Sequence, residues 1–567
     1  MKHIDHKFDF CVIGGGMSGL CAAIAAARHG IKTALIQDRP VLGGNASSEI
    51  RMHICGAGSR AKNTRETGII EEIFLENFHR NTNQNYYIWD SVLYEKAQYQ
   101  ENLSLFLNCT VNDAKMDGNR IVSVTAWSLT SETFHTFYAD VFADCSGDSI
   151  LAPLTGASFM LGREAKSEYG ETIPPDVSDK KTMGMSCLFQ IRETDRPQKF
   201  IPPSWAYVYE DDAPFAFKGH TDLKTNWWWI ELGGENDSIH DTEELKHELL
   251  KIAFGVWDHM KNRGDHGCEN WVMEWIGFLP GKRESRRYKG KYVVTQNDVA
   301  SEGRFSDIVA YGGWSMDDHF PAGFYHVSSH PTIYHNAPSP WGIPYRALIS
   351  ENIENLCFAG RNISVTHAAL SSSRVMATCA IIGQALGTAV AQAVKKKVML
   401  DRIDITELQN ELMFDDCWLP FRKREVSALT KEAKVSHPVL VNGYDRPIGN
   451  EENSAMLEKG EAVTFTFDGM RDIKGVRLIF DSNLCRSEKN MPCAYPLDLK
   501  GYDTPATLVR DYKLIFHTEN GDVTYEVNGN YQRYNLKDIA IRADKMTFIP
   551  IETNGSEKCN VFSIDVL

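Results

Sequence analysis

The chain has 567 residues, enough for roughly two to four domains with large hydrophobic cores. Its 43% hydrophobic and 24% charged residues are typical of a globular protein, and its net charge of −15 argues against non-specific binding to polyanionic nucleic acid. We expect no membrane-spanning stretch, and the charged start MKHIDHKFDF is unlike a signal peptide, so we expect a cytoplasmic protein that binds neither nucleic acid nor membrane.

The 13 cysteines are scattered singly along the chain, without a CxxC or another clustered ligand spacing. Their odd number argues against a disulfide framework. Local spacing therefore predicts no metal site, whether an iron–sulfur cluster or zinc.

Residues 9–51 have the pattern of a strand, a glycine turn, a helix and a second strand. In the turn, Gly14, Gly16 and Gly19 match GxGxxG. The first glycine allows the tight turn, the second lets the backbone approach a pyrophosphate, and the third lets the helix pack on the strand. An ordinary turn in an α/β core would explain the glycines, but not the strand before them and the helix and second strand after them. We predict a dinucleotide site, with Ser18 among its contacts.

The position that usually carries a ribose-binding carboxylate is occupied by Gln37, followed by Asp38 and Arg39. A glutamine amide can still hydrogen-bond a ribose hydroxyl. Which of these neighbours binds the ribose stays open.

A second glycine pair, Gly43 and Gly44, follows the second strand and precedes Asn45 and Ser47. In flavoproteins of the glutathione-reductase type, the backbone passes the FAD phosphates and ribitol at this point, and a Cβ would collide with the cofactor. NAD enzymes do not need this pair. The pattern therefore favours FAD, with these four residues among its contacts.

The next elements extend the same sheet. Residues 66–103 are predicted to be helical, LSLFLN to be a third parallel strand, and residues 110–138 to form hairpins around the turn MDGNR. The run DVFADCSGD then brings an apolar strand back to a Ser-Gly-Asp turn. In flavoproteins of this class, such a turn closes the first FAD segment, which predicts Asp148 at the cofactor.

Residues 355–396 complete the FAD site. The run LCFAG predicts a buried strand that ends at glycine, and a long helix is predicted to start near Ser372 or Ser373, capped by those serines. Its positive N-terminus would face the flavin pyrimidine. The alternative is a plain core strand and helix. The residues of this segment expected at the cofactor are Gly360, Arg361, Ser373 and Arg374.

These motifs resemble the FAD-dependent oxidoreductase family related to the flavin core of heterodisulfide reductase, on the fold shared with glutathione reductase and fumarate reductase. The resemblance covers residue 9 to about residue 397 and implies FAD and redox chemistry, without naming a reaction. The cluster-binding cysteine inserts of the heterodisulfide reductase branch are absent from the sequence. The segments that carry the resemblance are VIGGGMSG, IQDRPVLGGNASSEIR, ADCSGD, PGKRESRR, AYGGWSMDDH, IPYRAL, AGRNIS and SSSRVMATC.

The expected fold class is α/β: a Rossmann-like FAD-binding domain in two segments, with an inserted α+β substrate domain and a C-terminal β-sandwich. The all-β texture after the connector is similar to that of galactose-binding-like domains. Such a module could bind a ligand, or it could be an appendage that covers the flavoprotein or forms a contact in a homo-oligomer. The expected ranges are 1–156 and 341–400 for the FAD-binding domain, 157–340 for the substrate domain, 401–435 for a helical connector and 436–567 for the sandwich.

The predicted substrate domain carries a basic cluster at Lys282, Arg283, Arg286 and Arg287. It could hold a substrate carboxylate or contact the FAD phosphates. The alternative is a solvated turn that pairs with Glu284. We expect Arg283 or Arg286 to anchor the substrate.

The run WSMDDH places His319 two residues after Asp317, and His326, His330 and His335 follow. Histidine is a natural base for removing a hydroxyl proton while hydride leaves the adjacent carbon for flavin N5. A single loop histidine is more often structural, but the family resemblance at this run favours Asp317 and His319 as the catalytic pair.

Other side chains of interest are the tryptophans, including the run WWW at 227–229, and Cys55 with His53. Tryptophan faces suit sugar rings, although most of these rings are expected in the core. A redox-active Cys55 would need a partner cysteine, and none lies within a few residues. Covalent attachment of the flavin through His53 is a further alternative.

We therefore predict an FAD-dependent oxidoreductase that transfers hydride between flavin N5 and a small, carbohydrate-like substrate, with alcohol oxidation preferred. One alternative is a flavin-dependent reductase of an activated double bond. Another is a glycan-binding or assembly protein with a non-catalytic flavin core. The electron acceptor stays open, because a second GxGxxG for a nicotinamide cofactor is absent.

Overall fold

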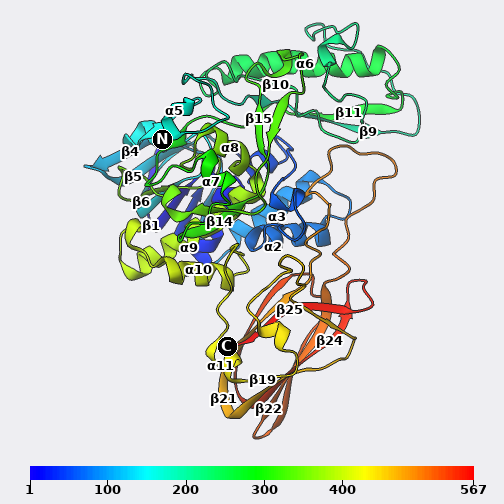
Figure 1. Cartoon of the computed structure of the whole chain (residues 1–567). Helices are drawn as coiled ribbons and strands as arrows, with labels where there is room; N and C mark the ends of the chain where they lie inside the picture. Colours follow the sequence, from blue (N-terminus) through cyan, green and yellow to red (C-terminus); the bar gives the residue numbers. More distant parts are fainter.

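The computed structural model describes residues 1–567. Figure 1 shows a central α/β body, a lobe above it that contains helix α6 (Thr242–Asn262), and a β module below it that ends at the C-terminus. The largest core cluster has 88 buried residues and lies in the α/β body.

The sheet of the body has strand order β3-β2-β1-β6-β5-β4, and β18 pairs with β6. The pairs among β1, β2, β3, β6 and β18 are parallel, whereas β5 pairs antiparallel with both β4 and β6. The predicted third parallel strand, the hairpins and the later buried strand are thus confirmed. The strands are β1 (Lys2–Ile13), β2 (Thr33–Ile36), β3 (Leu103–Phe106), β4 (Cys109–Asp117), β5 (Arg120–Ser128), β6 (Thr133–Asp144) and β18 (Leu356–Phe358).

Helices α1 (Met17–Arg28) and α9 (Met376–Lys396) pack in parallel across glycines. A Cβ on Gly383 would lie 2.0 Å from the Ser18 carbonyl oxygen, and one on Gly387 would lie 2.1 Å from that of Ala22. These contacts place Gly383 level with Ser18, so both helices start at the same end of the sheet. Helix α9 has about six more residues before this level than α1 has, so its N-terminus extends about 9 Å beyond that of α1. The two positive helix ends are therefore staggered along one edge.

The start of α9 differs from the sequence prediction. The serines end a separate short helix, α8 (His367–Ser373), which is capped by Thr366, and α9 begins after the extended residue Val375 without a side-chain cap. The Ser372 hydroxyl donates to the Trp314 carbonyl and is therefore not available at the start of α9. The serine cap was wrong for this reason.

Helix α9 is also long and apolar enough to cross a membrane, contrary to the expectation that no such stretch exists. However, 94% of its apolar window is buried inside the protein. It is the core helix of the α/β body, packed on α1. The other helices of the body and connector are α2 (Ile69–Arg80), α3 (Tyr86–Gln98), α4 (Leu151–Thr155), α5 (Lys166–Tyr169), α7 (Gln296–Ala300), α10 (Ile405–Phe414) and α11 (Ala428–Glu432).

The upper lobe has a separate core of 20 buried residues, which includes Trp227, Trp229 and Trp257. Small sheets surround it, and long irregular segments join them. The small-sheet strands between the two halves of the body are β7 (Phe159–Met160), β8 (Met185–Ser186), β9 (Phe189–Glu193), β10 (Glu231–Leu232), β11 (Trp271–Ile276), β12 (Gly281–Lys282), β13 (Arg287–Tyr288), β14 (Ile308–Gly312), β15 (Met316–His319), β16 (Thr332–His335) and β17 (Trp341–Pro344).

The C-terminal module is antiparallel, with strand order β20-β25-β21-β24-β22-β23 and β19 on β21, around a core of 24 buried residues. The all-β texture is confirmed, and this strand order is compatible with a β-sandwich. The strands are β19 (Lys434–Val435), β20 (Ala455–Leu457), β21 (Val463–Phe480), β22 (Val509–Thr518), β23 (Gly521–Val527), β24 (Tyr534–Thr553) and β25 (Cys559–Val566).

The loop between β21 and β22 leaves this module and packs on the rest of the protein. Buried Arg486 pairs with Glu71 of α2, and the Asn490 side chain accepts a hydrogen bond from the Ile54 backbone at 2.8 Å. The loop therefore reaches the segment that follows the second glycine pair.

Candidate functional site

The two glycine motifs lie side by side at the carboxyl edge of the sheet. Gly16 and Gly43 form a parallel β-bridge, and the Gly43 N–H donates to the Gly15 carbonyl at 2.8 Å. They line a cleft of about 370 Å³. The predicted cofactor contacts that line it are Gly14, Gly16, Ser18, Gln37, Asp38, Arg39, Gly43, Gly44, Asn45, Asp148, Gly360, Arg361 and Arg374.

The cleft fits a dinucleotide with a pyrophosphate. Helix α1 begins after Gly16 with no side-chain cap, so its first backbone N–H groups have no intrahelical or side-chain partner. Such groups bind phosphate, with the help of the helix dipole. A Cβ on Gly16 would point into open space, with the Gly44 Cα 4.0 Å away as its nearest contact. The backbone can therefore approach a phosphate closely.

Three predicted contacts do not line this cleft. A Cβ on Gly19 would lie 1.9 Å from the Gly14 carbonyl oxygen, so this glycine serves the close packing of helix on strand. Ser47 and Ser373 are fully buried, with hydroxyl oxygens that have no hydrogen-bond partner.

The side-chain amide of Gln37 makes hydrogen bonds to the protein backbone. Its Oε1 accepts from the Gly15 N–H at 2.7 Å, and its Nε2 donates to the Val41 carbonyl at 3.2 Å. The side chain thus joins the first glycine turn to the second. A ribose contact from Gln37, Asp38 or Arg39 stays a prediction.

Asp148 ties the two FAD segments together. Its carboxylate accepts from Arg361 at 2.6 Å and from Lys282 at 2.8 Å. Burial alone would raise the pKa of Asp148, but the two cations hold it well below its usual range. The carboxylate is therefore ionised at the cleft.

A second cavity of about 240 Å³ adjoins the cleft and shares residues with it, including Lys282, Arg374 and Met376 at the start of α9. The predicted pair Asp317 and His319 lines this cavity. The other lining side chains that matter here are Trp228, Arg283, Trp314, Tyr334, His53 and Cys55.

His319 is held by a carboxylate that sequence reasoning missed. Its Nδ1 lies 2.9 Å from Oε2 of the fully buried Glu231, and its Nε2 lies 3.5 Å from Oδ2 of Asp317. Burial would raise the pKa of Glu231, but Arg283 and His319 outweigh it and lower that pKa. Two ionised carboxylates therefore flank the ring. Strand β10, which carries Glu231, contains no recognisable motif. The only sequence signal for this residue was therefore its carboxylate side chain.

The predicted arginines are divided between different roles. Arg283 donates to Glu231, to the Ser186 hydroxyl and to the Trp228 carbonyl, so most of its donors have protein partners. Arg286 does not line the second cavity and donates to the Asp148 carbonyl at 3.3 Å.

Arg374 lines both cavities. Its Nη2 lies 3.3 Å from Oδ2 of Asp317, and its buried Nε has no partner. Arg361 lines both cavities too, but both of its terminal nitrogens donate to protein partners, Ser285 and Asp148.

Cys55 is a poor candidate for a nucleophile. Burial raises the pKa of this thiol to about 12, so it is protonated at neutral pH. Cys493 of the β21–β22 loop lies 3.6 Å from Nδ1 of His53, which lines the same cavity as Cys55. Burial and Lys489 lower the pKa of His53 to about 3, which keeps that ring neutral.

His367 also escaped the sequence reasoning. Its ring lies 2.9 Å from Glu284 and 3.1 Å from Asp318, and so it joins the motifs PGKRESRR and WSMDDH. Burial opposes its charge, but Glu284 and Asp318 raise the pKa of His367 to about 10. A histidine directly after the Thr366 cap was the only local signal.

Comparison with known proteins supports the redox assignment. A model of the family described as FAD dependent oxidoreductase matches residues 9–412. A soluble pyridine nucleotide transhydrogenase from Marinobacter nauticus is 46% identical over 43 residues, which are 8% of this chain. The chain spans 9% of the length of that relative.

Among solved structures, a geranylgeranyl bacteriochlorophyll reductase-like protein from Thermoplasma acidophilum is 12% identical, covering 73% of this chain and 85% of its own, with a TM-score of 0.31. The glycerol-3-phosphate dehydrogenase from Bacillus halodurans, complexed with FAD, is 16% identical over 34% of this chain and 41% of its own, with a TM-score of 0.21. A family 32 carbohydrate-binding module from Streptococcus pneumoniae EndoD is 12% identical over 24% of this chain and 92% of its own, with a TM-score of 0.18.

The family match covers more than half of the chain, and the cleft offers uncapped helix amides beside two glycine motifs, as FAD requires. The chain belongs to the FAD dependent oxidoreductase family and is an FAD-dependent enzyme.

Proposed function

We propose that the protein oxidises an alcohol group of a small, carbohydrate-like substrate bound in the second cavity. The observation that carries this proposal is the position of His319, which faces a cavity that adjoins the cofactor cleft. Bound FAD supplies a hydride acceptor. The substrate carbon would give up a hydride, and the hydroxyl would give up its proton to His319, which leaves a carbonyl product.

Glu231 orients the ring of His319 for this task. A carboxylate such as Glu231 can only accept, so Nδ1 of His319 carries the hydrogen of that contact. Nε2 is then the ring atom that takes the substrate proton. Asp317 at 3.5 Å stabilises the imidazolium that forms when Nε2 takes the proton.

We assign substrate anchoring to Arg374, because it lines both cavities and, of its two terminal nitrogens, only Nη2 is hydrogen-bonded within the protein, to Asp317. The aromatic faces of Trp228, Trp314 and Tyr334 suit a sugar ring. The same groups could instead serve the reduction of an activated double bond, with Arg374 polarising a carbonyl of the acceptor.

We propose two further assignments on the sequence motifs. The flavin core belongs to the branch related to the flavin core of heterodisulfide reductase. The C-terminal β module is a galactose-binding-like domain, and its β21–β22 loop brings Cys493 and Lys489 close to His53 at the second cavity.

The test is the visible spectrum of the purified FAD-loaded protein during anaerobic mixing with sugars, hydroxy acids and enoates. Bleaching of the flavin by a sugar or hydroxy acid is expected. Reoxidation of the pre-reduced flavin by an enoate, with no bleaching by any alcohol, would establish the reductase alternative instead.

A pair of variants tests the base. His319→Gln should slow flavin bleaching by about 10²–10⁴-fold at unchanged FAD content. His335→Gln is the matched control, because this residue lies at the end of the paired strand β16 and does not line the cavity. Equal rates in the two variants would remove His319 from the mechanism.

A further inference from the structure

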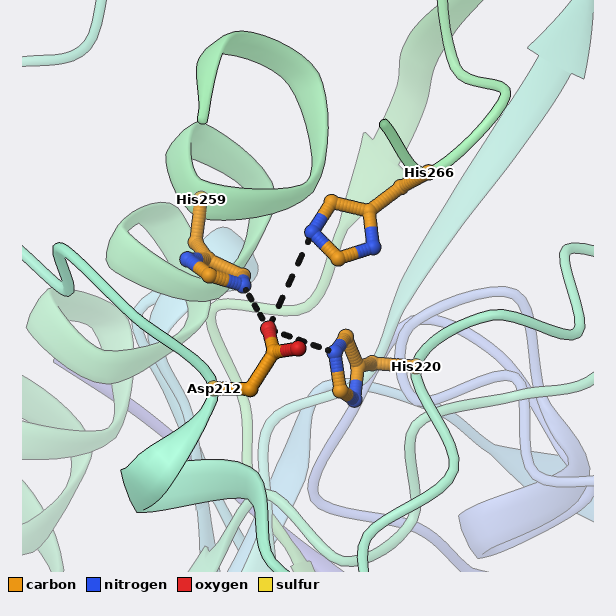
Figure 2. A group of neighbouring side chains, drawn as sticks. All are labelled: Asp212, His220, His259 and His266. Atoms are coloured by element: carbon orange, nitrogen blue, oxygen red, sulfur yellow. Dashed lines mark hydrogen bonds and ion pairs between the residues drawn. The ribbon is translucent and has the colours of Figure 1, made fainter. Parts of the chain in front are cut away.

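Three histidines and one aspartate converge in the upper lobe, away from both cavities. His259 lies on α6, Asp212 and His220 lie in the irregular segment before β10, and His266 lies in the loop after α6. One ligand atom from each lies within 4.8 Å of the others. Figure 2 shows the three imidazole rings facing the carboxylate of Asp212.

Backbone carbonyls fix the hydrogens of two of these rings. Nδ1 of His259 lies 2.9 Å from the Tyr209 carbonyl oxygen, and Nδ1 of His220 lies 3.0 Å from the Lys218 carbonyl oxygen. A carbonyl can only accept, so each Nδ1 carries a hydrogen. The neutral form of each ring then has a lone pair on Nε2.

Both of those Nε2 atoms face the same oxygen. Oδ1 of Asp212 lies 2.8 Å from Nε2 of His259, 3.3 Å from Nε2 of His220 and 3.9 Å from Nε2 of His266. A lone pair directed at a carboxylate oxygen is repelled unless a positive charge lies between them. If each Nε2 carried its own proton, the rings would be positively charged imidazolium ions that repel one another, with ring centroids 4.8 to 5.7 Å apart. One divalent cation satisfies all the facing atoms at once.

We propose that Asp212, His220, His259 and His266 bind a single Zn²⁺ ion in tetrahedral geometry. Imidazole nitrogen and carboxylate oxygen are ligands that zinc accepts, whereas calcium and magnesium prefer sites made of oxygen alone. Metal–ligand bonds of about 2.0 to 2.1 Å place tetrahedral ligand atoms about 3.3 Å apart. The Nδ1 bonds to carbonyls are the outer contacts that usually orient metal-binding histidines.

The ligands show what the ion would do. The chain between β9 and β10 has no helix or strand apart from one short turn of 3-10 helix, and it carries Asp212 and His220. A long segment of this kind is usually tied down by specific contacts. Zinc would fasten this segment to α6. Its ligand His220 comes eight residues before Trp228, and Trp228 lines the second cavity. The ion has a structural role that positions this wall of the cavity.

Cysteine spacing could not have indicated this site. Its ligands are spread over residues 212 to 266 in separate segments, and no pair of them has the spacing of a zinc motif. The prediction of no metal site rested on such spacing alone.

The experiment uses the full-length, FAD-loaded protein after treatment with a chelator. Titration with Co²⁺ should give the intense visible bands of a tetrahedral cobalt site, saturating at one ion per chain, and Zn²⁺ should displace them. Asp212→Ala should weaken Zn²⁺ binding by at least about 100-fold. His247→Ala is the matched control, because His247 is an exposed histidine on the same helix, and it should bind as the wild type does.

The Asp212 side chain is 68% exposed, so its removal leaves the core of the lobe intact. An unchanged flavin spectrum in Asp212→Ala would show that the variant is folded. His259→Ala should abolish the cobalt bands. Absence of tetrahedral bands in the wild type, or equal zinc affinity in Asp212→Ala and His247→Ala, would overturn the proposal.

Discussion

Nδ1 of His319 lies 2.9 Å from Oε2 of Glu231, a residue that comes 88 positions earlier in the chain. Glu231 is fully buried, and its other close partner is the guanidinium of Arg283 at 2.9 Å. The carboxylate therefore serves two groups: it orients the ring of His319 and neutralises a buried arginine. Glu231 acts on the chemistry through His319, so it is a positioning residue.

Replacing Glu231 by glutamine should lower the rate of flavin bleaching by about 10²-fold or more, with little change in KM, because an amide no longer fixes the hydrogen on Nδ1 of His319. The variant also leaves Arg283 without its counter-ion, so a lower melting temperature is expected. Ser186→Ala is the control, since it removes another partner of Arg283 without touching His319. If both variants slow bleaching equally, the effect comes from Arg283 and not from the ring.

Arg374 and Arg286 should behave differently. Arg374→Met removes the guanidinium that we assign to substrate anchoring, so we expect KM for the substrate to rise by about 10-fold or more. Arg286→Met should leave KM unchanged, because this side chain lies outside the second cavity. Steady-state kinetics at matched FAD content measures the difference. A rise in KM for Arg286→Met alone would restore the anchor expected from the sequence.

Gly16 offers a test of the cofactor cleft. The nearest atom to a Cβ added there is the Gly44 Cα at 4.0 Å, so Gly16→Ala should fold normally but fill space that FAD needs. The affinity for FAD should fall by about 10- to 100-fold, in line with an overpacking cost of about 1–3 kcal/mol. Gly219→Ala is the control, because a Cβ there meets nothing within 4 Å. Titration of the apoprotein with FAD gives both affinities.

His367 predicts how stability depends on pH. Glu284 and Asp318 outweigh burial and raise the pKa of His367 to about 10, against an ordinary value of about 6.5 in the unfolded chain. A raised pKa stabilises the fold fully below about pH 6.5, and this contribution is lost as the pH rises through about 10.

The wild type should therefore lose more stability than His367→Gln between about pH 6.5 and pH 10. Thermal melts of the two proteins across this range measure the difference. Parallel pH profiles would mean that His367 has no raised pKa in the folded protein.

The sequence predicted those elements that depend on residues close together in the chain. The pattern of residues 9–51 and the run LCFAG predicted strands β1, β2 and β18 because each depends on residues that are close neighbours in the chain. The start of α9 was missed because Ser372 and Ser373 are acceptable caps by residue type, whereas in the fold they end the separate helix α8 and Ser372 donates to the Trp314 carbonyl.

The candidate site was predictable only in part for the same reason. Asp317 and His319 lie in one motif, whereas Glu231 reaches His319 from 88 positions away and carries no local signal. Gln37 was expected at a ribose, but its amide joins the two glycine turns. Contacts of this kind depend on how distant segments meet, which residue patterns do not specify.

The contact between the β21–β22 loop and α2 is the last feature with a measurable consequence. Glu71 is fully buried and accepts two hydrogen bonds from Arg486. Burial would raise the pKa of Glu71, but Arg486 outweighs it and lowers that pKa, so the carboxylate is ionised. Arg486→Met should destabilise the protein by about 3–5 kcal/mol, because it takes away the cation that is hydrogen-bonded to a buried carboxylate.

Arg486→Met combined with Glu71→Gln should recover much of this loss, since no unpaired charge remains. The loop also holds Asn490 against the Ile54 backbone, next to Cys55 of the second cavity. Loosening it in the single variant should therefore also weaken substrate binding, which flavin bleaching at increasing substrate concentration can measure. If the single and double variants melt at the same temperature, the ion pair does not hold the loop in place.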